Sequence, residues 1–192
     1  MPTPSAVSAN VPSPIRNVAV FCASADGVDP VYRGAAVELG RRLAELGIGV
    51  VYGGAKVGLM QAIAESALAA GGRVIGVIPT VLVDLEVAHD GLTELHVVDT
   101  MHTRKATIGA RGDAFIVLPG GFGTFEEFFE ALAWQTLKLH AKPILVLNTN
   151  GFYDTLLTFL DECVEKGMLT QEKREIVLVA STVDEALAML RI

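Results

Sequence analysis

Short apolar runs alternate with stretches of helical periodicity from residue 15 to the end of the chain. Such runs are typical of strands buried on both faces, and a helix between successive strands makes them parallel. The sequence therefore predicts an α/β fold with a doubly wound parallel sheet and helices on both faces. The predicted strands cover residues 18–22, 48–52, 73–78, 95–98, 114–118 and 144–147. The predicted helices cover residues 30–46, 58–70, 101–110, 124–138, 152–166 and 183–190.

A chain of 192 residues is long enough for one domain with a sizeable core. We expect a single Rossmann-like domain over residues 15–192. Residues 1–14 are rich in Pro, Ser and Ala and lack the basic start and apolar stretch of a signal peptide, so we expect a flexible tail. Cys22 lies in a strand pattern and Cys163 in a helix pattern, which favours free thiols in a reducing, cytoplasmic compartment.

Charge and hydropathy exclude several classes of partner. The 15 Lys and Arg against 22 Asp and Glu give a net charge of −7, which argues against binding nucleic acid by neutralising its phosphates. The apolar runs are far shorter than the ~20 residues that cross a bilayer, so we expect no membrane segment. No pair of cysteines has metal-ligand spacing, and we expect no metal.

A glycine-rich turn, Pro-Gly-Gly-Phe-Gly-Thr-Phe-Glu-Glu at residues 119–127, joins a predicted strand to a predicted helix. This arrangement leaves free backbone N–H groups and the positive end of the helix dipole at one point, where a phosphate binds well. The alternative is a tight turn whose glycines need positive φ. A dinucleotide site fits poorly, because Glu126 holds the place of the third glycine.

Two more turns of small residues, at residues 22–27 and 52–58, also follow predicted strands. The carboxyl ends of parallel strands meet at one edge of the sheet, where ligands of such folds bind. We therefore expect these turns and residues 119–123 to share one pocket.

Thr124 and Glu127 allow two interpretations. Thr-x-x-Glu at the start of a helix is a capping box, in which each side chain accepts a hydrogen bond from a free backbone N–H. Alternatively, Glu127 is a catalytic carboxylate that the helix dipole keeps ionised. Such a group suits a nucleophile, a base or a stabiliser of a cationic transition state, and the spacing alone leaves both interpretations open.

Arg104 and Lys105 follow His102 on the first turns of a predicted helix, where the helix dipole disfavours cations. Solvation at the surface is the usual fate of such a pair. Without a matching acid in the next turn, however, the pair needs an anion from elsewhere, which a ligand or Glu127 could supply.

Residues 119–127 match the pattern PGGxGTxxE, and residues 101–105 match MHxRK. In order and spacing, these two motifs resemble those of the LOG (Lonely Guy) family of cytokinin-activating phosphoribohydrolases, often labelled lysine decarboxylases. Phe-Cys-x-Ser-x-x-Gly at residues 21–27 and Tyr-Gly-Gly-x-x-x-Gly-Leu-Met at residues 52–60 are also similar to the family. The resemblance covers nearly the whole chain after the tail.

The resemblance implies hydrolysis of the N-glycosidic bond of N6-substituted adenosine 5′-monophosphates, or of AMP, without a cofactor. The products are the free base, a cytokinin or adenine, and ribose 5-phosphate. By position, Arg104 and Glu127 are then the catalytic pair. The implied substrate-binding residues are Ser24, Gly54, Glu86, Lys105, Gly120, Gly121, Phe122, Gly123, Thr124, Phe125 and Glu126.

The chain departs from the family pattern at Ala23, Ala55 and Gln61, where glycine is usual, and we expect an effect on substrate range. One alternative is a non-catalytic carrier or sensor of a nucleotide or of molybdenum cofactor. Another is a lysine decarboxylase with pyridoxal phosphate on Lys56 or Lys105, which nothing else in the sequence supports.

Aromatic residues lie on more than one face of the predicted helix 124–138 and of the turn before it. They are Phe122, Phe125, Phe128, Phe129 and Trp134. One sheet face cannot cover this much apolar surface, and the family resemblance agrees, so we expect a homodimer with the site near the subunit boundary. A large monomer core is the alternative.

Overall fold

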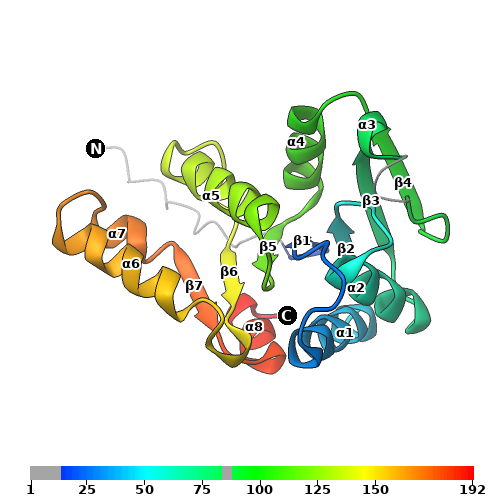
Figure 1. Cartoon of the computed structure of the whole chain (residues 1–192), viewed down its shortest axis with the longest axis horizontal. Coiled ribbons are helices and arrows are strands. Elements are labelled where there is room, and N and C mark those ends of the chain that lie inside the picture. Colours follow the sequence, from blue (N-terminus) through cyan, green and yellow to red (C-terminus); the bar gives the residue numbers. More distant parts are fainter. Residues whose placement is uncertain (1–13, 84–87) are drawn as a thin grey trace, which may run out of the picture.

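The computed structural model describes residues 14–83 and 88–192. In this part of the chain, seven parallel strands form one sheet in the order β4-β3-β2-β1-β5-β6-β7 (Figure 1). The doubly wound parallel sheet predicted from the sequence is confirmed. The strands are β1 (Asn17–Phe21), β2 (Gly49–Tyr52), β3 (Val74–Pro79), β4 (Glu94–Val98), β5 (Ala114–Val117), β6 (Ile144–Leu147) and β7 (Val177–Ala180).

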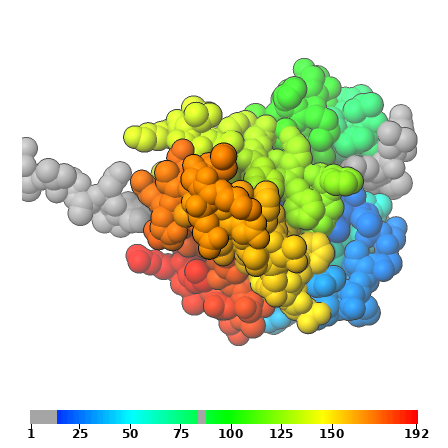
Figure 2. Space-filling view, turned by 60° about the vertical axis from the view of Figure 1, so that its left-hand side comes forward, coloured from blue at the N-terminus to red at the C-terminus, as the bar shows by residue number. Residues whose placement is uncertain are grey.

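Helices cover both faces of the sheet. The cluster with Leu39, Ile63 and Leu187 packs α1, α2 and α8 on one face, and the cluster with Ile108 and Phe128 packs α4 and α5 on the other (Figure 1). Figure 2 shows α6 and α7, in orange, on the surface between α5 and α8. The helices are α1 (Pro30–Glu45), α2 (Gly58–Ala69), α3 (Thr80–Val83), α4 (Met101–Arg111), α5 (Phe122–Thr136), α6 (Asp154–Glu165), α7 (Gln171–Arg174) and α8 (Val183–Leu190), with a 3₁₀ turn η1 (Thr149–Gly151).

Three short elements were not predicted from the sequence. The helices α3 and α7 span about one turn, which is too short to show helical periodicity. The edge strand β7 was missed although its sequence is as apolar as that of the predicted four-residue strands. All six predicted strands and all six predicted helices are present, with shifts at their ends. The predicted tail at residues 1–14 and Glu86 lie outside the described residues, except for residue 14.

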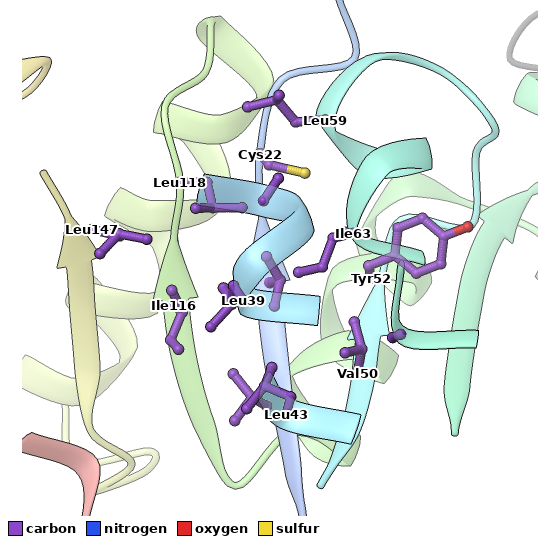
Figure 3. Packing of buried hydrophobic residues seen from close by; sticks show 14 of the residues in the cluster. Cys22, Leu39, Leu43, Val50, Tyr52, Leu59, Ile63, Ile116, Leu118 and Leu147 are labelled. Atoms are coloured by element: carbon purple, nitrogen blue, oxygen red, sulfur yellow. The ribbon is translucent and has the colours of Figure 1, made fainter. Parts of the chain in front are cut away.

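The strands β1, β2, β3, β5 and β6 are buried on both faces, as their continuous apolar character predicts, whereas the edge strand β4 has no buried residue. Figure 3 shows the cluster on the α1 and α2 side, which runs from Leu43 at one end to Leu59 and Cys22 at the other. Within the residues described, no helix is long and apolar enough to cross a membrane.

The winding of the chain reverses beside β1. Strands β1 to β4 are added in one direction along the sheet, and the chain then crosses back to place β5 on the other side of β1. The connections that leave β1 and β5 therefore diverge toward opposite faces, to α1 and α5. A crevice forms between them at the carboxyl edge of the sheet.

Helix α4 is held at both of its ends. At its start, the Thr100 hydroxyl accepts a hydrogen bond from the Thr103 N–H at 3.1 Å. At its end, Lys142 Nζ donates to the carbonyl oxygens of Gly109 and Gly112, at 2.6 Å each. Burial lowers the pKa of Lys142, although the charge of Asp113 acts in the opposite direction. Because it lies at these two carbonyl groups, the Lys142 ammonium neutralises the negative end of the α4 dipole.

We predict that Lys142→Met lowers the free energy of unfolding by about 1.5–3 kcal/mol, because two carbonyl groups lose a charged donor. Urea unfolding followed by circular dichroism measures the change. The control is Lys166→Met, which removes only a surface ion pair with Glu162 and should cost less than about 0.5 kcal/mol. Equal losses in the two variants would contradict a special role for Lys142.

Candidate active site

A cleft of about 190 Å³ opens at the carboxyl ends of β1 and β5, where the winding of the sheet reverses. One wall is the turn after β1 and the other is the start of α5, with side chains from α2 and α4 between them. The lining residues are Cys22, Ala23, Ser24, Ala25, Met60, Arg104, Gly121, Phe122, Gly123, Thr124 and Glu127. The predicted shared pocket thus forms mainly from the first and third glycine or small-residue turns.

Helix α5 presents an uncapped N-terminus to the cleft. Gly121 is its N-cap, and within the described chain no side chain caps it. The first helical hydrogen bond runs from the Phe125 N–H to the Gly121 carbonyl at 3.0 Å. The four N–H groups of residues 121–124 therefore have no acceptor within the helix, which suits an anion.

The capping-box interpretation of Thr124 and Glu127 is wrong. The helix begins at Phe122, so Thr124 is its third residue and not its N-cap. The glycines at residues 121 and 123 tolerate an earlier start than the Thr-x-x-Glu pattern indicates. The buried Thr124 and the carboxylate of Glu127 both line the cleft instead.

The three glycines of the turn do not have the positive φ that the tight-turn interpretation requires. Gly120 is needed for a close approach, because a Cβ there would lie 2.6 Å from Thr124 Cβ. At Gly121 and Gly123, among the described residues, no atom other than those of the chain neighbours and of the same helix's backbone lies within 4 Å of the place a Cβ would occupy. These two glycines leave space beside the N–H groups for a ligand.

The opposite wall is fixed by the start of α2. Gly58, with φ +53°, approaches so closely that a Cβ would lie 2.6 Å from the Ala25 carbonyl oxygen. The Leu59 N–H donates to the Ala23 carbonyl at 3.0 Å, and Asp26 Oδ1 accepts from the Gly58 N–H at 3.1 Å. A carboxylate thus neutralises the N-terminus of α2, while the N-terminus of α5 stays open to an outside anion.

Arg104 extends from α4 beneath the cleft and is buried. Its Nε donates to the Val77 carbonyl at 3.1 Å, and its Nη2 donates to the Gly53 carbonyl at 2.9 Å. Two backbone groups, one within β3 and one directly after β2, therefore set the plane of the guanidinium. The side chain reaches the same cleft as Glu127.

Whereas Arg104 lines the cleft, the Lys105 side chain lies beside two glutamates of α5. Its Nζ binds Glu126, and it lies 2.9 Å from Glu130 Oε1. Burial alone would lower the pKa of Lys105, yet hydrogen bonds and charge from Glu126 and Glu130 outweigh it and raise that pKa. This ion-paired group lies outside the residues that line the cleft.

Cys22 contributes a neutral thiol to the floor of the cleft. Burial, and then the nearby charge of Glu127, raise the pKa of Cys22 well above its usual range. The thiol therefore stays protonated and is a poor nucleophile.

The structure brings seven of the predicted site residues together in the cleft: Arg104, Glu127, Ser24, Gly121, Phe122, Gly123 and Thr124. Five others lie outside the lining. Gly54 packs against β3, Gly120 against Thr124, Phe125 on the ring of Tyr153, and Lys105 and Glu126 pair with each other. Glu86 lies outside the described residues.

The predicted turn at residues 22–27 also brings Cys22, Ala23 and Ala25 to the lining, although the sequence assigned none of the three a role. Met60 on α2 is a lining residue that the sequence did not predict. Of the three departures from the family pattern, only Ala23 lines the cleft. Ala55 is buried and pairs with Ala88, and Gln61 donates to Glu65 on the surface of α2.

Comparison with known proteins identifies relatives along the whole chain. A family model described as possible lysine decarboxylase matches residues 60–190. A cytokinin riboside 5′-monophosphate phosphoribohydrolase of Rhodococcoides fascians is 45% identical over 192 residues, which is 100% of this chain and 96% of the relative. An Arabidopsis thaliana protein of the same description is 43% identical over 178 residues, which is 93% of this chain and 84% of that protein.

Among solved structures, the molybdenum cofactor carrier protein of Chlamydomonas reinhardtii has a similar fold, with a TM-score of 0.69. The likeness covers 91% of this chain and 95% of that one at 23% sequence identity, so it concerns the fold alone. The family is shown by the far higher identity to the phosphoribohydrolases. The chain belongs to the LOG family of cytokinin riboside 5′-monophosphate phosphoribohydrolases, whose family model is described as possible lysine decarboxylase.

Proposed function

We propose that the protein hydrolyses the N-glycosidic bond of adenosine 5′-monophosphates, with or without an N6 substituent, and releases the free base and ribose 5-phosphate. One observation carries the proposal: Arg104 and Glu127 line a cleft together with the uncapped N-terminus of α5. The names of the relatives from Rhodococcoides fascians and Arabidopsis thaliana support the same reaction.

The 5′-phosphate binds at the start of α5. The N–H groups of residues 121–124 and the positive end of the helix dipole stabilise its charge, and the Ser24 hydroxyl on the opposite wall adds a donor. The phosphate is remote from the bond that breaks. Its binding energy therefore serves to orient the ribose.

Glu127 acts on the sugar. Departure of the base leaves C1′ with the character of an oxocarbenium ion, and a fixed carboxylate close to C1′ stabilises that charge or traps the sugar before water attacks. The neutral thiol of Cys22 takes no part as a nucleophile, because its raised pKa keeps it protonated.

Arg104 orients Glu127 or polarises the leaving base. A guanidinium stays protonated in proteins, so Arg104 is no general base. The two carbonyl groups that accept from its Nε and Nη2 keep the guanidinium in place while charge develops on the substrate.

The residues do not fit a lysine decarboxylase. That reaction needs a lysine that forms a Schiff base with pyridoxal phosphate. Lys105 is bound by two glutamates, and Lys56 lies 4.0 Å from Asp90 on the surface. Among the described residues that line the cleft, there is no lysine.

A non-catalytic carrier is the remaining alternative, since a cofactor carrier has a similar fold. A carrier needs an anion site but has no use for a carboxylate and a buried arginine beside the ligand. The presence of both Arg104 and Glu127 in the cleft favours the enzyme.

We predict base release from AMP or isopentenyladenosine monophosphate. For adenosine, kcat/KM should be lower by roughly 10²-fold or more, because charge-assisted hydrogen bonds of about 1.5–3 kcal/mol each are lost. ATP should also be poor, since the short turn has room for one phosphate. Chromatography of released base measures the rates. Equal rates on nucleoside and nucleotide would contradict a phosphate site at α5, and binding without base release would favour a carrier.

We predict that Glu127→Gln lowers kcat by roughly 10²-fold or more, because the amide lacks the charge that C1′ requires. Nucleotide binding and the melting temperature should change little, since Glu127 is not a helix cap. Steady-state kinetics, calorimetric titration with AMP and thermal unfolding give the three values. Glu162→Gln on the surface of α6 is the control. An active Glu127→Gln variant would eliminate the catalytic role.

We also propose a homodimer with the cleft near the subunit boundary. Phe122 at the cleft is 93% exposed, Phe129 on α5 is 40% exposed, and Leu137 and Leu139 after α5 are 69% and 68% exposed. A monomer would leave this apolar surface in water. A two-fold interface over α5 would bury it.

Light scattering at micromolar concentration tests the dimer. The expected mass is about twice the 20.3 kDa of the chain, or a larger even multiple. Phe129→Glu should shift the mass toward the monomer, because a charge at the interface is costly to bury. A mass near 20.3 kDa for the unchanged protein would refute the dimer.

A further inference from the structure

The backbone of Gly53 supports the Arg104 guanidinium. The Gly53 carbonyl accepts from Arg104 Nη2 at 2.9 Å, while the Val77 carbonyl holds Arg104 Nε from the other side. Gly53 is not among the residues that line the cleft. It lies directly after β2, one residue before Gly54, and both glycines belong to the motif at residues 52–60.

A side chain at Gly53 would overlap the ends of two neighbouring side chains, which would have to shift. A Cβ there would overlap Arg104 Nη2 and Met60 Cε, both at separations well inside the 3.0 Å that real Cβ atoms keep, and would lie 3.2 Å from Arg104 Cζ. A shift of Met60 would relieve only one of these overlaps. The guanidinium would still have to move.

The loop that carries Gly53 cannot easily move instead. The Gly54 carbonyl accepts from the His89 N–H at 3.0 Å, and Tyr52 Oη donates to the Ala55 carbonyl at 3.2 Å. Gly54 itself packs on β3, since a Cβ there would lie 3.2 Å from the Val77 nitrogen. Residues on both sides of Gly53 are thus anchored, and any added atom must displace Arg104.

We infer that Gly53 is a positioning residue: the absence of its side chain and the direction of its carbonyl place the Arg104 guanidinium for the reaction. This inference rests on the proposed function for its effect on turnover. Its effect on Arg104 itself does not depend on that function. Misplacing a catalytic group by about 1 Å can cost about 10²-fold in rate.

The test is Gly53→Ala, with two matched controls. Gly49→Ala crowds Asn17 Oδ1 at the opposite end of the same strand, and Gly34→Ala adds a methyl group in open space on α1. The first control reports the cost of crowding β2 without touching Arg104. The second reports the effect of a glycine-to-alanine change alone.

The direct readout is the ¹H–¹⁵N resonance of Arg104 Nε–H, assigned by its loss in Arg104→Lys. We expect Gly53→Ala to shift this resonance or to broaden it through exchange with water, while both controls leave it in place. For base release from AMP, kcat should fall by about 10–10²-fold with little change in KM. The controls should keep the wild-type kcat even where Gly49→Ala lowers the melting temperature.

If Gly53→Ala does not fold, Gly53→Ala with Met60→Ala makes room on the methionine side and retains the overlap with Arg104 Nη2. A folded variant that keeps the wild-type resonance, or the wild-type kcat, overturns the inference. If the unchanged protein releases no base from any nucleotide, the proposed function fails, and the resonance alone decides whether Gly53 positions Arg104.

Discussion

The position of β1 between β2 and β5 is the constraint on which the cleft depends. Because the winding reverses there, the turns after β1 and β5 leave toward opposite faces and expose the backbone between them. The strands β2 and β3 follow β1 in the sheet, and the carbonyl groups of Gly53, after β2, and of Val77, within β3, hold Arg104. The sheet thus supplies the floor, and loops and helix starts supply the walls.

The two helix starts beside the cleft differ in how their positive charge is balanced. The N-terminus of α2 is satisfied within the chain by Asp26, whereas that of α5 is left for a ligand. The cationic side chains of α4 divide in the same way, because Lys105 is neutralised by Glu126 and Glu130 while Arg104 turns toward the cleft. The start of α5 is therefore a place in the cleft that favours an anion.

Apolar strands and helical periodicity predicted the parallel sheet and six of its seven described strands, because they report burial directly. The motifs predicted Arg104, Glu127 and the start of α5 as parts of one site. Contacts between segments that lie far apart in the chain could not be predicted from the sequence. The pairing of Lys105 with Glu126, the support of Arg104 by Gly53, and the early start of α5 at Phe122 depend on how elements pack, which spacing along the chain does not encode.

Lys142 connects two segments that lie far apart in the sequence. It lies on the connection between α5 and β6, yet its ammonium holds the last carbonyls of α4, the helix that carries Arg104. We therefore expect the end of α4 and this connection to open together, so that their backbone amides exchange with solvent at similar rates. The helix that carries Arg104 is in this way linked to the connection after α5.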